Sequence, residues 1–128
     1  EYYQPQRRDG TLRAFRQHHL IDDVFAWPGL QDITASVDFT ALAEAGTQAG
    51  FDLAGYTTQA NFLLGNGLQE RLNEAEARAD ETTLLRLRNE AKRLTLPSEM
   101  GERFQVMGFS SEVEFGTAFL FNDLSWRL

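Results

Sequence analysis

The segment from Gln31 to Thr40 constrains the fold of this chain more than any other, because it joins a strand pattern directly to a helix start. Within it, Ile33 to Val37 alternates apolar and small polar residues, which predicts a buried strand. Asp38 follows at the position of a helix N-cap, where a carboxylate accepts from the free amides of the first turn. Up to Gly50, apolar residues then keep helical spacing, at Phe39, Leu42, Ala43 and Ala49. A strand, a helix and a glycine stop in this order are typical of α/β proteins.

The next part of the chain continues this alternation. Phe51 to Tyr56 predicts a second strand, and the pair Thr57-Thr58 predicts the cap of a short helix that ends at Gly65-Asn66-Gly67. A polar stretch at residues 80–83 then interrupts an apolar repeat of helical period, which predicts two helices or one kinked helix. Pro97 ends this helical region, because proline cannot continue a helix.

Two apolar segments near the end, residues 104–109 and 117–121, predict a terminal antiparallel strand pair joined by a polar turn. We therefore expect an α/β sheet with flanking helices, and at least one parallel connection from the first predicted strand to the second. Four or five strands would leave one sheet edge bare, so we expect further strands on the N-terminal side that this chain lacks. The predicted organisation is a single partial domain over residues 1–128, with a loop-rich region at 1–31, strand–helix–strand at 32–56, helices at 57–97 and terminal strands at 103–128.

Composition and charge exclude several classes of function. The 12 basic and 19 acidic residues give a net charge of -7, which argues against a general nucleic-acid binder or a polybasic membrane anchor. The chain has no cysteine, which excludes disulfides and thiolate chemistry and suits a cytosolic protein. No apolar run approaches the roughly 20 residues that span a bilayer. His18 and His19 precede Asp22 and Asp23 without the spacing of a metal site, so we predict no metal.

Several motifs together resemble the C-terminal half of the MidA family of class I methyltransferases, which includes the mitochondrial complex I assembly methyltransferase and many bacterial members. The resemblance covers nearly all of the chain, in order and at family-like spacing. Ser36 and Trp126 stand where the family usually has histidine. The matching segments are Gly10-Thr-Leu12, Pro28-Gly-Leu-Gln-Asp-Ile-Thr34, Val37-Asp-Phe-Thr-Ala-Leu42, Gly55-Tyr-Thr-Thr-Gln59, Phe62-Leu-Leu64 and Glu99-Met-Gly-Glu102 with Phe104.

The resemblance implies a Rossmann-like fold and S-adenosylmethionine as the cofactor of the complete protein, with an arginine of a protein as the acceptor in the mitochondrial member. It also implies a cytoplasmic location in bacteria and a mitochondrial one in eukaryotes. In such folds a glycine-rich turn after a strand holds the cofactor. The Gly65-Asn66-Gly67 sequence follows a predicted helix instead, where it is typical of a helix end. We therefore expect this chain alone to bind no cofactor and to be inactive.

Two carboxylates are the candidate catalytic residues. A guanidinium acceptor stays charged up to a pH of about 12, because its pKa is so high. Carboxylates must therefore orient it and help its proton leave. Asp32 and Asp38 flank the predicted strand and are the predicted catalytic pair, although Asp38 can also act only as an N-cap and Asp32 can only close a turn. The predicted substrate-binding residues are Thr34, Gln59, Phe62 and His18.

Two functions remain open from the sequence. In the first, the chain is the substrate-side half of a methyltransferase that acts on a protein, and the cofactor side comes from a missing N-terminal half or a second copy of the chain. In the second, the chain is a non-catalytic protein-binding or assembly module. The first function requires a bare apolar sheet edge beside Ile33–Val37, whereas a module would cover that edge with its own residues.

Overall fold

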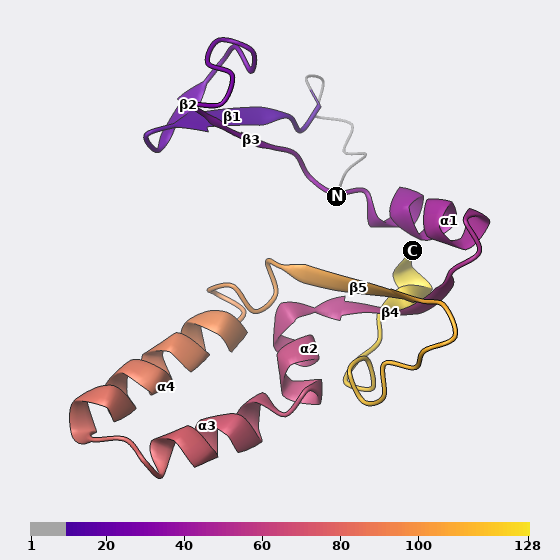
Figure 1. Ribbon diagram of the computed structural model, residues 1–128. Coiled ribbons are helices and arrows are strands. Elements are labelled where there is room, and N and C mark those ends of the chain that lie inside the picture. The colour runs from indigo at the N-terminus through magenta and orange to yellow at the C-terminus, as the bar shows by residue number, and fades with distance from the viewer. Residues whose placement is uncertain (1–9) are drawn as a thin grey trace. The chain divides into compact units, whose positions relative to one another are not determined.

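The computed structural model describes residues 10–128, and the chain divides into two compact units, Glu1–Phe39 and Thr40–Leu128. The first unit contains a three-stranded antiparallel sheet in the order β2-β1-β3 (Figure 1). Its strands are β1 (Arg13–Arg16), β2 (His19–Ile21) and β3 (Asp32–Thr34). Ala14 at the centre of β1 is fully buried, so this small sheet packs around its middle strand.

A tight hairpin joins β1 to β2, although the sequence predicted only a loop-rich region at residues 1–31. Gln17 and His18 form the two-residue turn with φ angles of 49° and 65°, as a type I′ turn requires. The hairpin was missed because this turn usually carries Asn-Gly or Asp-Gly, and Gln17-His18 gives no such signal.

The strand predicted at Ile33–Val37 needs correction. The observed strand β3 covers only Asp32–Thr34, and it pairs antiparallel with β1 on one side. Its side chains are exposed within this structure, with Ile33 55% exposed. The expected parallel connection to the next strand is also wrong for the described residues, since every strand pair found among them is antiparallel.

The second unit contains the two-stranded antiparallel sheet of β4 and β5, with helices before, between and after its strands (Figure 1). Gly55 lies opposite Gly108 in this pairing, next to an irregularity of the register. The elements in chain order are α1 (Phe39–Gln48), β4 (Asp52–Thr58), α2 (Gln59–Gly65), α3 (Leu68–Glu76), α4 (Glu81–Thr95), β5 (Gln105–Ser110) and the short 3-10 helix η1 (Ser125–Arg127).

Helix boundaries follow the sequence prediction closely. Thr58 caps α2 by accepting from the Asn61 N–H, and Asp80 caps α4 by accepting from the Thr83 N–H. Gly50 takes a φ of 90° after α1, where its N–H and that of Phe51 bond back to the last turn in a Schellman motif. The predicted break between α3 and α4 is confirmed, because Asp80 starts a separate helix.

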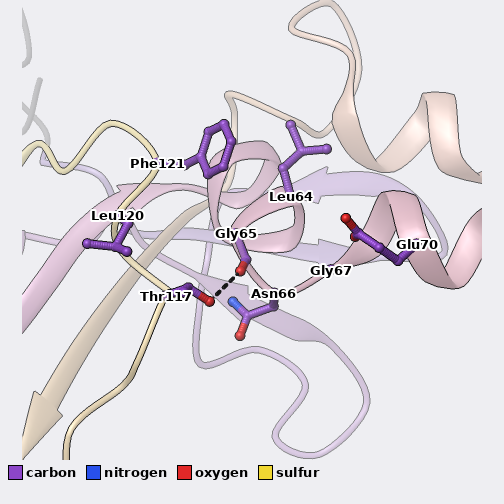
Figure 2. A pocket seen from close by; sticks show the side chains of 8 residues that line it. All are labelled: Leu64, Gly65, Asn66, Gly67, Glu70, Thr117, Leu120 and Phe121. Atoms are coloured by element: carbon purple, nitrogen blue, oxygen red, sulfur yellow. Dashed lines mark hydrogen bonds between the residues drawn. The ribbon is translucent and has the colours of Figure 1, made fainter.

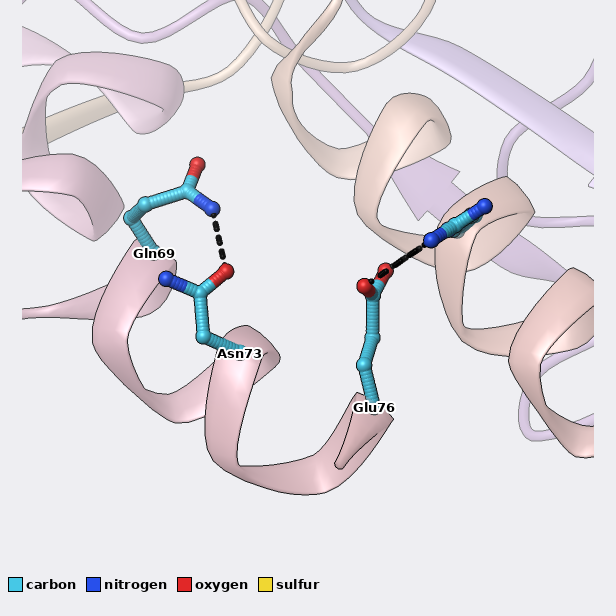
Figure 3. A network of polar contacts seen from close by, with 4 residues as sticks. Gln69, Asn73 and Glu76 are labelled. Atoms are coloured by element: carbon cyan, nitrogen blue, oxygen red, sulfur yellow. Dashed lines mark hydrogen bonds and ion pairs between the residues drawn. The ribbon is translucent and has the colours of Figure 1, made fainter. Parts of the chain in front are cut away.

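Helices α3 and α4 form a hairpin held by a two-point ion pair (Figure 3). The Arg88 guanidinium donates from Nε and Nη2 to the two oxygens of Glu76 at 2.8 and 3.1 Å. The hydrogen bond from Arg88 lowers the pKa of Glu76 below its ordinary value. Gln69 and Asn73 add a side-chain hydrogen bond of 2.9 Å along α3. The ion pair therefore joins the two helices at their exposed surface.

The predicted strand at residues 117–121 is wrong, and this segment instead forms turns that insert an aromatic ring into the unit. Phe119 is 6% exposed, and its ring lies where Gly55 and Gly108 leave the sheet surface free of side chains. A Cβ at Gly55 would lie 2.3 Å from the Phe119 ring, and one at Gly108 would lie 2.6 Å from it. Phe62 and Phe115 contact the same ring, with centroid distances of 5.4 and 5.5 Å. The partner of β5 is consequently β4 and not the 117–121 segment.

The C-terminal segment runs along the edge of β4 that β5 leaves open. The Leu124 N–H donates to the Tyr56 carbonyl at 2.7 Å, and the Tyr56 N–H donates to Asp123 Oδ1 at 3.1 Å. Thr57 is fully buried beside this contact, and its hydroxyl donates to the Asn122 carbonyl at 2.9 Å. β4 is thus the central element of the second unit.

None of the helices in the described part of the chain is both long and apolar enough to span a membrane.

Candidate functional site

The first unit carries four of the six predicted site residues. Asp32 and Thr34 lie on β3, opposite Phe15 and Arg13 of β1. Because alternate residues of a strand share a face, Asp32 and Thr34 project from the same side of the sheet, and both are exposed. The pair thus offers a carboxylate and a hydroxyl to a ligand on that face.

His18 and Asp38 lie at different places in this unit. His18 sits in the β1–β2 turn, and the register places Asp32 at the same end of the sheet as that turn. Asp38 directly precedes α1 and is half-buried, at the position predicted for the N-cap. The structure therefore brings Asp32, Thr34 and His18 onto one small sheet, while the roles of all four residues stay predictions.

The other two predicted residues, Gln59 and Phe62, belong to α2 in the second unit. The Gln59 side chain donates to the Leu94 carbonyl at 2.9 Å and so ties α2 to the end of α4. Phe62 is half-buried and packs against the buried ring of Phe119. These contacts show a structural use for both residues, and their part in substrate binding stays a prediction.

Sequence reasoning missed a hollow in the second unit, which lies between the α2–α3 turn and the 117–121 segment (Figure 2). Its volume is about 490 Å³. The Thr117 hydroxyl donates to the Gly65 carbonyl at 2.9 Å and joins the two sides. No single motif signals such a hollow, because its two sides lie far apart in the sequence. The lining residues are Leu64, Gly65, Asn66, Gly67, Glu70, Thr117, Leu120 and Phe121.

A second missed feature is the Asp123 turn, which a sequence reading could find from Asn122-Asp123 followed by Ser125. Asp123 Oδ1 accepts from the Tyr56 N–H, the Ser125 N–H and the Ser125 hydroxyl. Burial raises the pKa of the Asp123 carboxyl, but these hydrogen bonds outweigh burial and hold the pKa below its ordinary value. The turn therefore attaches the C-terminal segment to β4 through a charged acceptor.

Asp123→Ala is expected to lower the free energy of unfolding by about 1–3 kcal/mol, because the Tyr56 N–H loses this acceptor. The contribution of the charge depends on pH. Since the pKa of Asp123 is lower in the folded state, its stabilisation is present above the unfolded-state pKa and is lost as pH falls through the folded-state pKa. Urea denaturation at about pH 7 and about pH 2 measures both effects.

Asp123→Asn is the matched control for that experiment. It keeps an oxygen acceptor for the Tyr56 N–H but cannot ionise, so it is expected to lose less stability than Asp123→Ala at neutral pH. Equal losses for the alanine and asparagine variants would show that the acceptor at this position contributes nothing.

The Gly65-Asn66-Gly67 segment does not fit a cofactor loop. Asn66 is the C-cap of α2, and Gly67, with a φ of 79°, is the N-cap of α3. The segment therefore joins two helices, whereas a nucleotide-binding turn joins a strand to a helix. Among residues 10–128 we find no group of three or more histidine, aspartate or glutamate side chains that could hold a metal ion.

Comparison with known proteins identifies the class and then the family. The model of a family of S-adenosyl-L-methionine-dependent methyltransferases matches residues 1–57. A crystal structure of a Burkholderia thailandensis protein matches 99% of this chain with 44% identity and a TM-score of 0.86. A second structure from this organism, bound to S-adenosyl-homocysteine, matches 99% of the chain with 43% identity and a TM-score of 0.82. The fold is therefore part of a Rossmann-like methyltransferase fold of the α/β class.

The curated relatives narrow this class to a family. The mitochondrial protein arginine methyltransferase NDUFAF7 of Danio rerio is 36% identical over 82% of this chain, and its Drosophila melanogaster homolog is 35% identical over 76%. This chain belongs to the MidA-type methyltransferase family. It spans 24% of the zebrafish protein and 34% of the first Burkholderia chain, so the match concerns one part of each.

Proposed function

We propose that this chain is the substrate-side part of an S-adenosylmethionine-dependent methyltransferase whose acceptor is an arginine of a protein. The observation that carries the proposal is the match of nearly the whole chain to about a third of a protein that binds S-adenosyl-homocysteine. The acceptor class comes from the names of the curated relatives, which are protein arginine methyltransferases. These relatives are mitochondrial by name, so we propose a mitochondrial location for a eukaryotic source and a cytoplasmic one for a bacterial source.

Bare strand edges, among them those of β3 and β5, support the view that the sheet continues beyond this chain. Within the described residues β3 pairs only with β1, and β5 pairs only with β4. Ile33 beside the first of these edges is 55% exposed, as a missing neighbour would leave it. Such edges are the feature that separates a partial sheet from a self-contained binding module.

The carboxylates give the substrate side its proposed chemistry. The cofactor supplies the methyl group when it is bound to the complete protein. Asp32 is exposed beside Thr34 on one face of β3, where its oxygens can accept both donors of a guanidinium edge and fix its plane. A fixed acceptor nitrogen favours in-line transfer, and a nearby carboxylate stabilises the proton that this nitrogen must release.

One observation favours the alternative, a non-catalytic assembly module. The α3–α4 hairpin buries none of its side chains fully, and Leu85 on α4 is 59% exposed. A helical surface of this kind can bind a partner without any chemistry. The two functions differ in whether the complete protein binds S-adenosylmethionine.

Calorimetry with S-adenosylmethionine tests whether cofactor binding requires parts of the complete protein outside this chain. The complete protein is expected to bind the cofactor, and the 128-residue chain alone is expected to show no binding, because the glycine segment of this chain joins two helices. Circular dichroism of the chain is the control for its helix content. Micromolar binding of S-adenosylmethionine by the chain alone would contradict the proposal that the chain is only the substrate-side part. No binding by the complete protein would favour the assembly module.

A further inference from the structure

We infer that the hollow between the α2–α3 turn and the 117–121 segment is a binding site for an arginine side chain of a polypeptide partner (Figure 2). That the partner is also the methyl acceptor rests on the proposed function, but binding at the hollow does not. The hollow is open to solvent and has a volume of about 490 Å³.

The polar side chains of the hollow offer more acceptors than donors. Asn66 donates one of its two side-chain N–H groups to the Phe62 carbonyl at 2.7 Å, which leaves its Oδ1 as an acceptor and its second N–H as a donor. The Thr117 hydroxyl hydrogen is directed to the Gly65 carbonyl. Glu70 adds an exposed carboxylate, the only charged side chain among the lining residues. A ligand group that carries several hydrogen-bond donors can therefore bind along this wall.

The charge of the hollow selects a cation. Glu70 lies in the first turn of α3, and its carboxylate approaches to 3.5 Å of the position that a Cβ of Gly67 would take. It therefore already places a negative charge at the positive end of this helix, and an anionic ligand would be repelled there. The net charge of -7 on the chain further favours a basic partner.

The apolar lining selects a cation with an apolar stem. Leu120 is 75% exposed and Phe121 is 56% exposed, and both line the hollow together with Leu64. The three methylenes of an arginine side chain can cover this surface while the guanidinium reaches the acceptors. The planar guanidinium also stacks on aromatic rings, which Phe121 provides, and it carries five donors for the polar wall.

Fluorescence anisotropy on the complete protein without cofactor tests this site, with a fluorescein-labelled Gly-Leu-Arg-Leu-Gly peptide as the probe. Replacing its arginine by citrulline, which is neutral and of nearly the same shape, is expected to weaken binding roughly two- to fivefold, as is Glu70→Gln. Leu120→Ser is expected to weaken the binding of both the arginine and the citrulline peptide, because it removes exposed apolar surface without disturbing the core.

Glu81→Gln is the matched control, since Glu81 also lies in the first turn of a helix and is exposed, but does not line the hollow. It is expected to leave the affinity unchanged. Equal affinities for the arginine and citrulline peptides, or equal losses for Glu70→Gln and Glu81→Gln, would overturn the inference. A methyl-transfer assay on the same preparations separates the two proposals. Methyl transfer without arginine-selective binding would overturn only the inference that the hollow binds arginine. Arginine-selective binding without methyl transfer would overturn only the proposed function.

Discussion

Phe119→Ala is expected to lower the free energy of unfolding of the second unit by about 3–5 kcal/mol, the range for removal of a buried aromatic ring. The Phe119 ring is 6% exposed and fills the surface above Gly55 and Gly108. Neither glycine has a side chain that could occupy the space left by the ring. The cavity would therefore stay open, and the contacts of Phe62 and Phe115 with the ring would be lost at the same time.

Hydrogen exchange on the complete protein measures this effect locally, since peptides from β4 and β5 report opening of the sheet. Phe121→Ala is the matched control, because it makes the same change two residues away at a side chain that is 56% exposed. Its effect on exchange is expected to be small. Similar exchange in the two variants would show that the ring of Phe119 does not anchor the sheet.

Phe119 also shows why part of the fold escaped prediction. The residues Thr117-Ala-Phe-Leu-Phe121 favour a strand by local propensity, and this led to the wrong assignment. Their conformation is set instead by the two glycines on β4 and β5, which lie far away in the sequence and leave room for one ring. Tertiary packing of this kind has no local signal.

The helix boundaries could be predicted because their causes are local. Asp80 and Thr58 accept from amides three residues ahead, and Gly50 provides the positive φ that ends α1. The same reasoning placed Asp38 directly before α1, where the structure has it. The β2 strand was missed because its turn, at Gln17 and His18, lacks the usual glycine.

The candidate site was predictable only where its residues are neighbours in sequence. Asp32 and Thr34 share a face of β3 by simple alternation, which the sequence already implies. The hollow could not be predicted in this way, because Gly65 and Thr117 are 52 residues apart and meet only in the folded unit. Gln59 and Phe62 were proposed for substrate binding, but which of their contacts are structural could be read only from the folded chain.

Asp32→Asn in the complete protein is expected to reduce the rate of methyl transfer to arginine by about 10²-fold or more, the usual contribution of a positioned acid–base group. Asparagine has nearly the same shape, so it can occupy the exposed position on β3 without changing the strand. It lacks the negative charge that orients a guanidinium and stabilises its departing proton. Because the loss acts on transfer, the affinity for S-adenosylmethionine is expected to stay unchanged.

The control for this change is Asp22→Asn, which removes the charge of another exposed carboxylate in the same unit but outside the strands. Transfer kinetics with a saturating arginine peptide and cofactor-binding calorimetry, applied to both variants, separate catalysis from cofactor affinity. A selective fall in turnover for Asp32→Asn would assign this carboxylate to the acceptor. Undiminished turnover would show that Asp32 has no role in methyl transfer. The carboxylate that orients the acceptor would then have to be Asp38 or a residue elsewhere in the complete protein.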